Sequence, residues 1–185
     1  MDEAAAGKHY EIKTEVLGPS REELKEIRIL SRVVRWTKEG IAYEAGPRHA
    51  EIVCQQLQLE ECRPVSSPGT KEEGTTKEDC DVALTHEQAS LFRALAARCN
   101  YLSTDRPDIA FATKELARSM SSPTRGSWEK MKRMGRYLKG QPRMVCWFDW
   151  QSANPNLQIF TDADWAGCKV TRKSTSGGCV LRGTH

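Results

Sequence analysis

The spacing of apolar residues changes along the chain, and each change marks an element that we expect. Near the start, apolar residues alternate with polar ones or gather in short β-branched runs, which is typical of strands. Three strands are predicted there, at 9–17, 26–36 and 41–44. A helix is predicted next, at 48–58, because its apolar residues share one side and Pro47 suits a first helical turn.

In the middle of the chain, apolar residues recur at intervals of three and four, which predicts helices. Three helices are expected, at 87–100, 107–120 and 124–139. Thr85 is placed to cap the first of them. Gly135, inside the third, costs roughly 1 kcal/mol of helix stability against Ala, so it indicates close contact with another element. None of these helices buries enough surface alone, and together they predict a three-helix packet.

The last part of the chain again has the pattern of strands. A compact aromatic strand is expected at 143–150, and a hairpin is expected from strands at 156–162 and 175–181. Residues 66–81 separate the first strands from the helices and are rich in Ser, Thr, Gly, Lys and Glu, which predicts a flexible, acidic linker. The pattern as a whole predicts an α+β fold.

The composition limits the class of protein. Hydrophobic residues make up 38% of the 185 residues and charged residues 29%, as in ordinary soluble globular proteins. No apolar run approaches the roughly 20 residues that span a membrane, and the N-terminus lacks an apolar signal core, so we expect neither a membrane protein nor secretion. The 7 cysteines include no Cys-x-x-Cys pair. They favour reduced thiols in an intracellular protein, in the cytoplasm or nucleus, over a disulfide framework or a zinc site.

The net charge of +3 is less informative than its distribution, because most of the positive excess lies in the predicted helix at 124–139. Lys132, Arg136 and Lys139 share one side of it, which suggests contact with the phosphates of a nucleic acid. The alternative is a solvated outer face.

Two carboxylates follow the apolar run of the strand at 156–162. Asp162 and Asp164 are two residues apart, so on a continuing strand they would point to the same face, roughly 6–7 Å from each other. A carboxylate at the end of a buried strand needs a cation, either a divalent metal or a basic partner. Arg172 and Lys173 in the hairpin loop could offset this charge or extend a surface that binds nucleic acid. The alternative for the two acids is a solvated turn.

Four stretches resemble one family. Thr-Asp-Ala-Asp-Trp-Ala-Gly at 161–167 and Arg-Lys-Ser-Thr-Ser-Gly at 172–177 resemble the opening hairpin of the ribonuclease H domain in copia-type retrotransposon Pol polyproteins. The stretches 101–110 and 136–140 resemble the Tyr-Leu…Arg-Pro-Asp-Ile and Arg-Tyr-Leu-Lys-Gly signatures of the same family.

The resemblance covers most of the chain from about residue 10 to residue 185 and implies a division into four segments. The first is the end of a reverse transcriptase palm, with a ββα order. A flexible acidic linker, a helical thumb and connection, and the truncated start of a ribonuclease H-like domain follow it. In order, these segments are 1–65, 66–83, 84–141 and 142–185.

The parent implied by the resemblance is an RNA-directed DNA polymerase with ribonuclease H activity. In the family, the acid that matches Asp162 is one of four carboxylates that hold two Mg²⁺ ions, whereas Asp164 matches a signature residue without an assigned role. The family's further acids begin in a Ser-Ser-x-Glu-Ala-Glu stretch that this chain does not reach, and the polymerase aspartates would lie upstream.

We therefore expect this chain alone to bind nucleic acid rather than to catalyse a reaction. The partners that the resemblance implies are an RNA–DNA hybrid and the rest of the polyprotein. Two alternatives stay open: a non-catalytic basic binding module, and an inert remnant of a decayed element.

Overall fold

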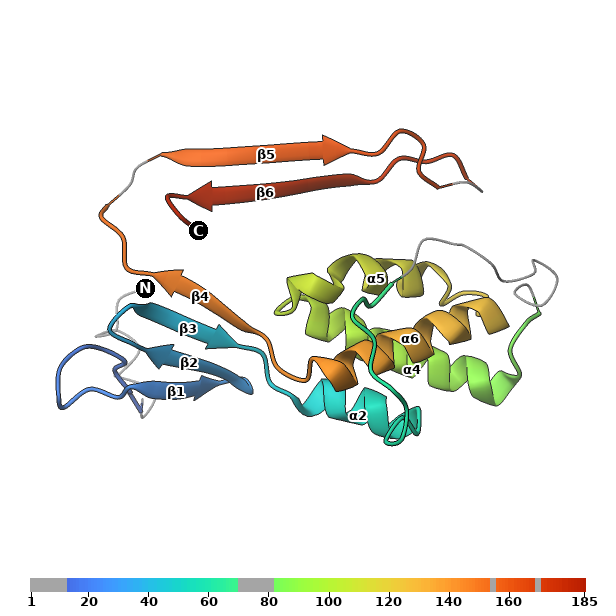
Figure 1. Cartoon of the computed structure of the whole chain (residues 1–185), viewed down its shortest axis with the longest axis horizontal. Coiled ribbons are helices and arrows are strands. Elements are labelled where there is room, and N and C mark those ends of the chain that lie inside the picture. The colour runs from blue at the N-terminus through green and yellow to red at the C-terminus, as the bar shows by residue number, and fades with distance from the viewer. Residues whose placement is uncertain (1–12, 70–81, 154–155, 169–170) are drawn as a thin grey trace, which may run out of the picture. The chain divides into compact units, whose positions relative to one another are not determined.

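The computed structural model describes residues 13–69, 82–153, 156–168 and 171–185 (Figure 1). They fall into two compact units, which we describe separately. The helical unit consists of Arg28–Val33 and the described parts of 44–145. The strand unit consists of the described parts of 1–27, Val34–Tyr43 and 146–185.

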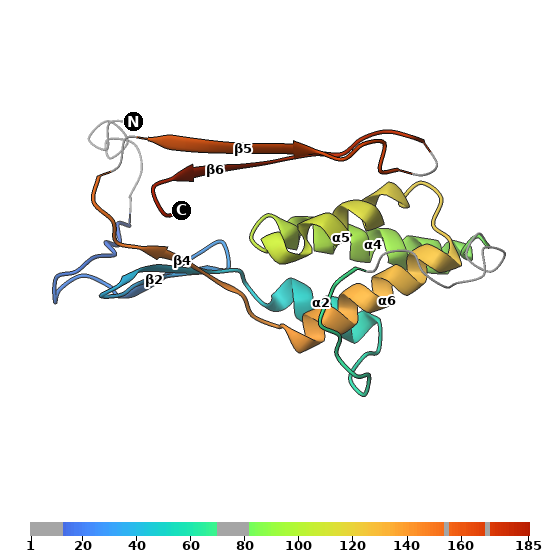
Figure 2. The same cartoon turned by 45° about the horizontal axis from the view of Figure 1, so that its top comes forward.

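Four helices form the core of the helical unit. They are α2 (Arg48–Gln56), α4 (His86–Ser103), α5 (Pro107–Arg118) and α6 (Arg125–Gly140). The apolar side of each faces the others, and α2 lies beside α6 in both views (Figures 1 and 2). The predicted cap at Thr85 is confirmed, because its hydroxyl accepts a hydrogen bond from the Gln88 amide at 3.3 Å. Side chains that this packing buries almost completely include Phe92, Leu95, Ile109, Leu116, Met131, Met134 and Leu138.

Gly135 lies where α6 meets the end of α2, as the sequence predicted. A Cβ atom at this position would be 2.5 Å from Cδ1 of Leu59 and 2.8 Å from Cδ1 of Leu57. The thiol of Cys54 in α2 donates a hydrogen bond to the carbonyl of Gly135, with 3.4 Å between sulfur and oxygen. The missing side chain therefore permits a close approach that any larger residue would obstruct.

A buried ion pair fixes the start of α5 against the end of α6. Arg106 is only 2% exposed, and its Nε and Nη2 donate to the two carboxylate oxygens of Asp108 at 2.9 and 2.7 Å. The hydroxyl of Tyr137, on α6, donates to Oδ2 of Asp108 at 2.8 Å. Nη2 of Arg106 also reaches the carbonyl of Gln141, just past α6, at 3.1 Å. We call Arg106, Asp108 and Tyr137 the buried polar cluster.

The cluster changes the proton affinity of its carboxylate. Burial is the largest single influence on Asp108 and would raise its pKa. The hydrogen bonds from Arg106 and Tyr137, the positive charge of Arg106 and a backbone hydrogen bond together outweigh burial, so the pKa of Asp108 lies below its ordinary value. The charged form of Asp108 is therefore the one that the fold stabilises.

Three of the strands precede α2, as many as the sequence predicted but with different bounds. They are β1 (Glu26–Ile29), β2 (Arg32–Trp36) and β3 (Gly40–Glu44). The single strand predicted at 26–36 is wrong, because Leu30 and Ser31 form a tight turn with φ of 48° and 69°. Positive φ at two successive residues is typical of hairpin turns with Asn or Gly, and neither residue type is present to signal the turn.

The first predicted strand is largely wrong where the structure describes it. Residues 13–16 are in no strand, and Leu17 makes only an isolated bridge to Leu24. Residues 9–12 lie outside the described residues, as does most of the predicted linker.

β4 (Val145–Asp149) completes a sheet with the strand order β1-β2-β3-β4. In the strand unit, the Trp36 and Trp150 rings lie 4.3 Å apart between centroids, and the indole N–H of Trp150 donates to the carbonyl of Thr37 at 3.1 Å. β5 (Leu157–Ala163) and β6 (Ser176–Arg182) form a separate antiparallel hairpin, as predicted. The mixture of helices and sheets agrees with an α+β class, while the assignment to palm, thumb and ribonuclease H segments stays a prediction.

Among the helices in the described ranges, none combines the length and the apolarity that crossing a membrane requires.

Replacing Tyr137 by Phe should lower the free energy of unfolding by about 1.5–3 kcal/mol, because the Asp108 carboxylate loses a hydrogen bond. Urea unfolding followed by circular dichroism measures the change. The matched control is Tyr101→Phe, since Tyr101 is 48% exposed and lies outside the buried polar cluster. Equal destabilisation by the two substitutions would contradict the role that we give to Tyr137.

The pH dependence of stability should also report on the cluster. Because the pKa of Asp108 is lower in the folded than in the unfolded chain, its ionised form stabilises the fold at neutral pH. This contribution is lost as the pH falls below about 4, the ordinary pKa of an Asp side chain, toward the lowered folded value. Asp108→Asn should therefore make stability at neutral pH lower and its decline in acid shallower. An unchanged acid decline in unfolding experiments would refute this assignment.

Candidate functional site

Asp162 lies where the sequence placed it, near the end of the first strand of the hairpin. It is exposed on β5 and stands opposite Gly177 of β6. Mg²⁺ takes several oxygen ligands in near-octahedral geometry, and one carboxylate cannot supply them. Among the residues that the structure describes, no group of three or more His, Cys, Asp or Glu side chains could hold a metal ion. The described residues therefore do not fit a two-magnesium centre.

Asp164 organises the loop that follows β5. Its Oδ1 atom accepts hydrogen bonds from the backbone amides of Thr175, at 2.6 Å, and Gly167, at 3.3 Å. Its own amide donates to the carbonyl of Thr175 at 3.0 Å. The Ser174 hydroxyl accepts from the amide of Ala166 at 3.0 Å, so a second signature residue holds the same loop. These contacts give Asp164 a structural role, whereas no role could be assigned to it from the sequence.

Arg172 and Lys173 lie in this loop, at the same end of the hairpin as Asp162. Both are exposed. The amide of Arg172 donates to the carbonyl of Cys168 at 2.8 Å, and the carbonyl of Lys173 accepts from the amide of Cys168 at 3.2 Å. These two bonds tie Cys168 to Arg172 and Lys173, while the two basic side chains are accessible to solvent.

The three basic residues predicted on one side of α6 all make contacts within the helical unit. Lys132 pairs with Glu129 at 2.8 Å. Arg136 donates through Nε to the carbonyl of Arg63 at 2.7 Å. Lys139 donates to the carbonyl of Cys62 at 2.8 Å and also to that of Glu60. Arg136 and Lys139 therefore hold the segment that follows α2, a role that helical periodicity could not indicate.

The predicted basic residues fall into two groups. Lys132, Arg136 and Lys139 belong to the helical unit, while Arg172 and Lys173 belong to the strand unit.

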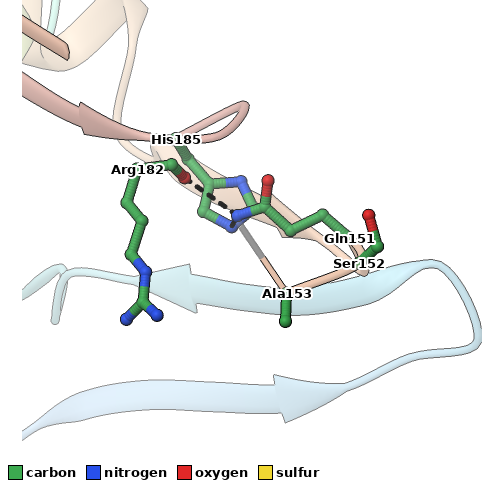
Figure 3. Close-up of a pocket in the computed structure, with 5 residues that line it drawn as sticks. All are labelled: Gln151, Ser152, Ala153, Arg182 and His185. Carbon is green, nitrogen blue, oxygen red and sulfur yellow. Dashed lines mark hydrogen bonds between the residues drawn. The ribbon is translucent and has the colours of Figure 1, made fainter. Parts of the chain in front are cut away.

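A small hollow lies where the strand unit's hairpin ends (Figure 3). It is lined by Gln151, Ser152, Ala153, Arg182 and His185. The Gln151 amide group donates to the carbonyl of Arg182 at 2.9 Å and accepts from the amide of Thr184 at 2.9 Å. These contacts tie the end of β6 to the segment before β5.

Known proteins similar to this chain decide its family. The chain is 34% identical over 94 residues to the retrovirus-related Pol polyprotein from transposon RE2 of Arabidopsis thaliana, and 26% identical over 166 residues to that from transposon TNT 1-94 of Nicotiana tabacum. The chain belongs to the copia-type retrotransposon Pol polyproteins. The two matches cover 51% and 87% of this chain, but only 6% and 12% of the respective Pol polyproteins.

A third relative has a name that does not refer to a Pol polyprotein. The uncharacterized mitochondrial protein AtMg00810 of Arabidopsis thaliana is 30% identical over 138 residues, which are 75% of this chain and 55% of that protein. The chain therefore spans about half of this relative and a small part of the Pol polyproteins. No protein-family model and no solved structure matches the chain.

The copia-type signatures acquire a physical explanation from the fold. Arg106, Asp108 and Tyr137, which belong to the two helical signatures, form the buried polar cluster. Gly140 ends one signature where a Cβ atom would lie 2.7 Å from Cβ of Pro64. The cluster was not predicted from the sequence, in which Asp108 was only part of a predicted helix. The sequence pattern that could have indicated the cluster is Arg106-Pro107-Asp108, in which an Arg precedes the first-turn Pro of a helix and an acid follows it.

Replacing Asp164 by Ala should speed hydrogen exchange of the Thr175 amide about tenfold, because a hydrogen bond to a charged acceptor contributes about 1.5 kcal/mol. Amide exchange followed by NMR measures the rate. Asp162→Ala is the matched control, since Asp162 is also an exposed carboxylate at this end of the hairpin. If both substitutions speed exchange equally, Asp164 has no special role in the loop.

Proposed function

We propose that this chain is a nucleic-acid-binding part of a copia-type Pol polyprotein and that it does not catalyse a reaction alone. It would comprise the end of the reverse transcriptase palm, the thumb and connection, and the start of the ribonuclease H domain. The observation that carries the binding proposal is the charge of α6, which has six basic residues and one acid.

The contacts of α6 do not cancel this charge. Arg136 and Lys139 donate to backbone carbonyls, which are neutral, so each keeps its full positive charge. Lys132 pairs with Glu129, the one acid of α6, so the other five basic residues of the helix are in excess. A concentrated positive charge attracts the phosphates of a nucleic acid and makes binding depend on salt. The preferred ligand in this proposal is an RNA–DNA hybrid.

The activities of the parent enter the proposal from the family. The parent would be an RNA-directed DNA polymerase with a Mg²⁺-dependent ribonuclease H, and Asp162 would supply one of the metal's carboxylates there. The rest of the polyprotein would contribute the other ligands and the polymerase site. An intracellular location is part of the same proposal.

A second candidate is an inert remnant of a decayed element, and the hairpin favours it. Two-stranded hairpins are marginally stable in water. The apolar side chains of this one are exposed, including Ile159 at 68% and Val180 at 61%. Slow amide exchange along β5 and β6 would argue against a remnant.

The binding proposal predicts a salt dependence that α6 controls. Replacing Lys132, Arg136 and Lys139 together by Gln should weaken binding to an RNA–DNA hybrid. It should also reduce the slope of log affinity against log salt by up to about 3, or roughly 0.9 for each lost phosphate contact. Fluorescence anisotropy at several salt concentrations measures the slope.

The control keeps the charge and changes only the side chains. Lys132→Arg, Arg136→Lys and Lys139→Arg in one variant should preserve the slope. Circular dichroism of both variants shows whether the segment after α2 stays folded, since two of these residues hold it. If the Gln variant is folded and its slope of log affinity against log salt is unchanged, α6 does not contact the nucleic acid.

A further inference from the structure

A cleft in the helical unit lies between the β1–β2 turn, the start of α2 and the end of α4. Its lining includes Arg32, Arg48, His49, Tyr101 and Asp105. We propose that this cleft binds a phosphate group, which in the setting of the proposed function belongs to a nucleic-acid strand. None of these residues was among the site residues predicted from the sequence.

The fold holds the cleft in shape before any ligand arrives. The turn packs closely on Gly46, where a Cβ atom would lie 2.5 Å from the carbonyl oxygen of Ser31. Arg32 pairs through Nε with Oδ2 of Asp105 at 2.8 Å, and its guanidinium carbon lies 5.7 Å from the centroid of the Tyr101 ring. A preformed site avoids the entropy cost of ordering its groups when a ligand binds.

The charges around the cleft favour an anion. Arg32 and Arg48 line it, and Arg98 of α4 is close enough to act on His49. Against them stands Asp105, which is paired with Arg32. Guanidinium groups are well suited to phosphate because their planar array of donors can contact two oxygens together.

His49 adds a donor that can respond to a bound anion. Its ring lies 4.7 Å from the Tyr101 ring, and its Nδ1 atom is buried without a hydrogen-bond partner among the described residues. Burial lowers the pKa of His49, and the charges of Arg98 and Arg48 lower it further. A phosphate beside this ring would favour its protonated form, so binding should raise the pKa.

The start of α2 supports the same assignment. Pro47 at the start of α2 provides no side-chain cap, as is also true of Arg106 at the start of α5, whereas α4 and α6 begin with capping boxes at Thr85 and Thr124. Pro47 therefore offers no side-chain acceptor to the amides of the first turn of α2, and the positive end of the helix dipole favours an anion there.

The test is an NMR titration of the whole chain with inorganic phosphate and, separately, with a short RNA–DNA hybrid. Phosphate should shift the amide signals of residues 48–50 in a saturable way and raise the pKa of His49. Arg48→Gln should weaken phosphate binding about tenfold, as expected for losing a charged hydrogen bond. Arg21→Gln is the control and should leave phosphate binding unchanged, because Arg21 is likewise an exposed arginine but does not line the cleft.

The hybrid separates this inference from the proposed function. If the hybrid shifts the same signals and Arg48→Gln reduces the shifts, the cleft holds a nucleic-acid phosphate. If only inorganic phosphate does so, the cleft is a phosphate site for a small ligand, and the nucleic-acid source is wrong. If neither probe shifts the signals of residues 48–50, the inference is overturned, whereas the salt slope of the α6 variants still tests the proposed function.

Discussion

The helical unit depends on the ion pair between Arg106 and Asp108. A guanidinium that is 2% exposed would be very costly to bury alone, and here both carboxylate oxygens of Asp108 offset its desolvation. The Tyr137 hydroxyl and the Gln141 carbonyl complete the set of partners from the end of α6. Because these partners come from two helices, the ion pair fixes how α5 and α6 lie against each other. Apolar packing alone specifies such an arrangement less tightly.

The basic side of α6 shows that one residue can have a structural and an electrostatic role at once. Arg136 and Lys139 hold the carbonyls of the segment after α2, and they still carry the charge on which nucleic-acid binding would rest. A substitution there changes both properties. Exchanging Arg for Lys separates them, since it keeps the charge and alters the geometry of the hydrogen bonds.

The sequence predicted most of the elements because their information is local. The three long helices follow from apolar spacing and capping residues, and the hairpin follows from a short apolar run and its partner strand. The turn at Leu30 and Ser31 could not be predicted in this way, because tertiary contacts rather than Gly or Asn hold it. The same limit applies to the candidate sites. Asp162 was placed correctly on a strand end, whereas the cleft combines Arg32, Arg48 and Asp105, which lie far apart in the sequence.

The exposure of the β5–β6 hairpin has a practical consequence for handling the protein. Leu157, Ile159, Phe160 and Val180 are each more than half exposed. Full burial of such a side chain gains about 1.5–3 kcal/mol, and the outer edges of a two-stranded ribbon offer unpaired backbone groups to other chains. Concentrated solutions should therefore favour strand pairing between molecules, and aggregation is expected to begin at this hairpin.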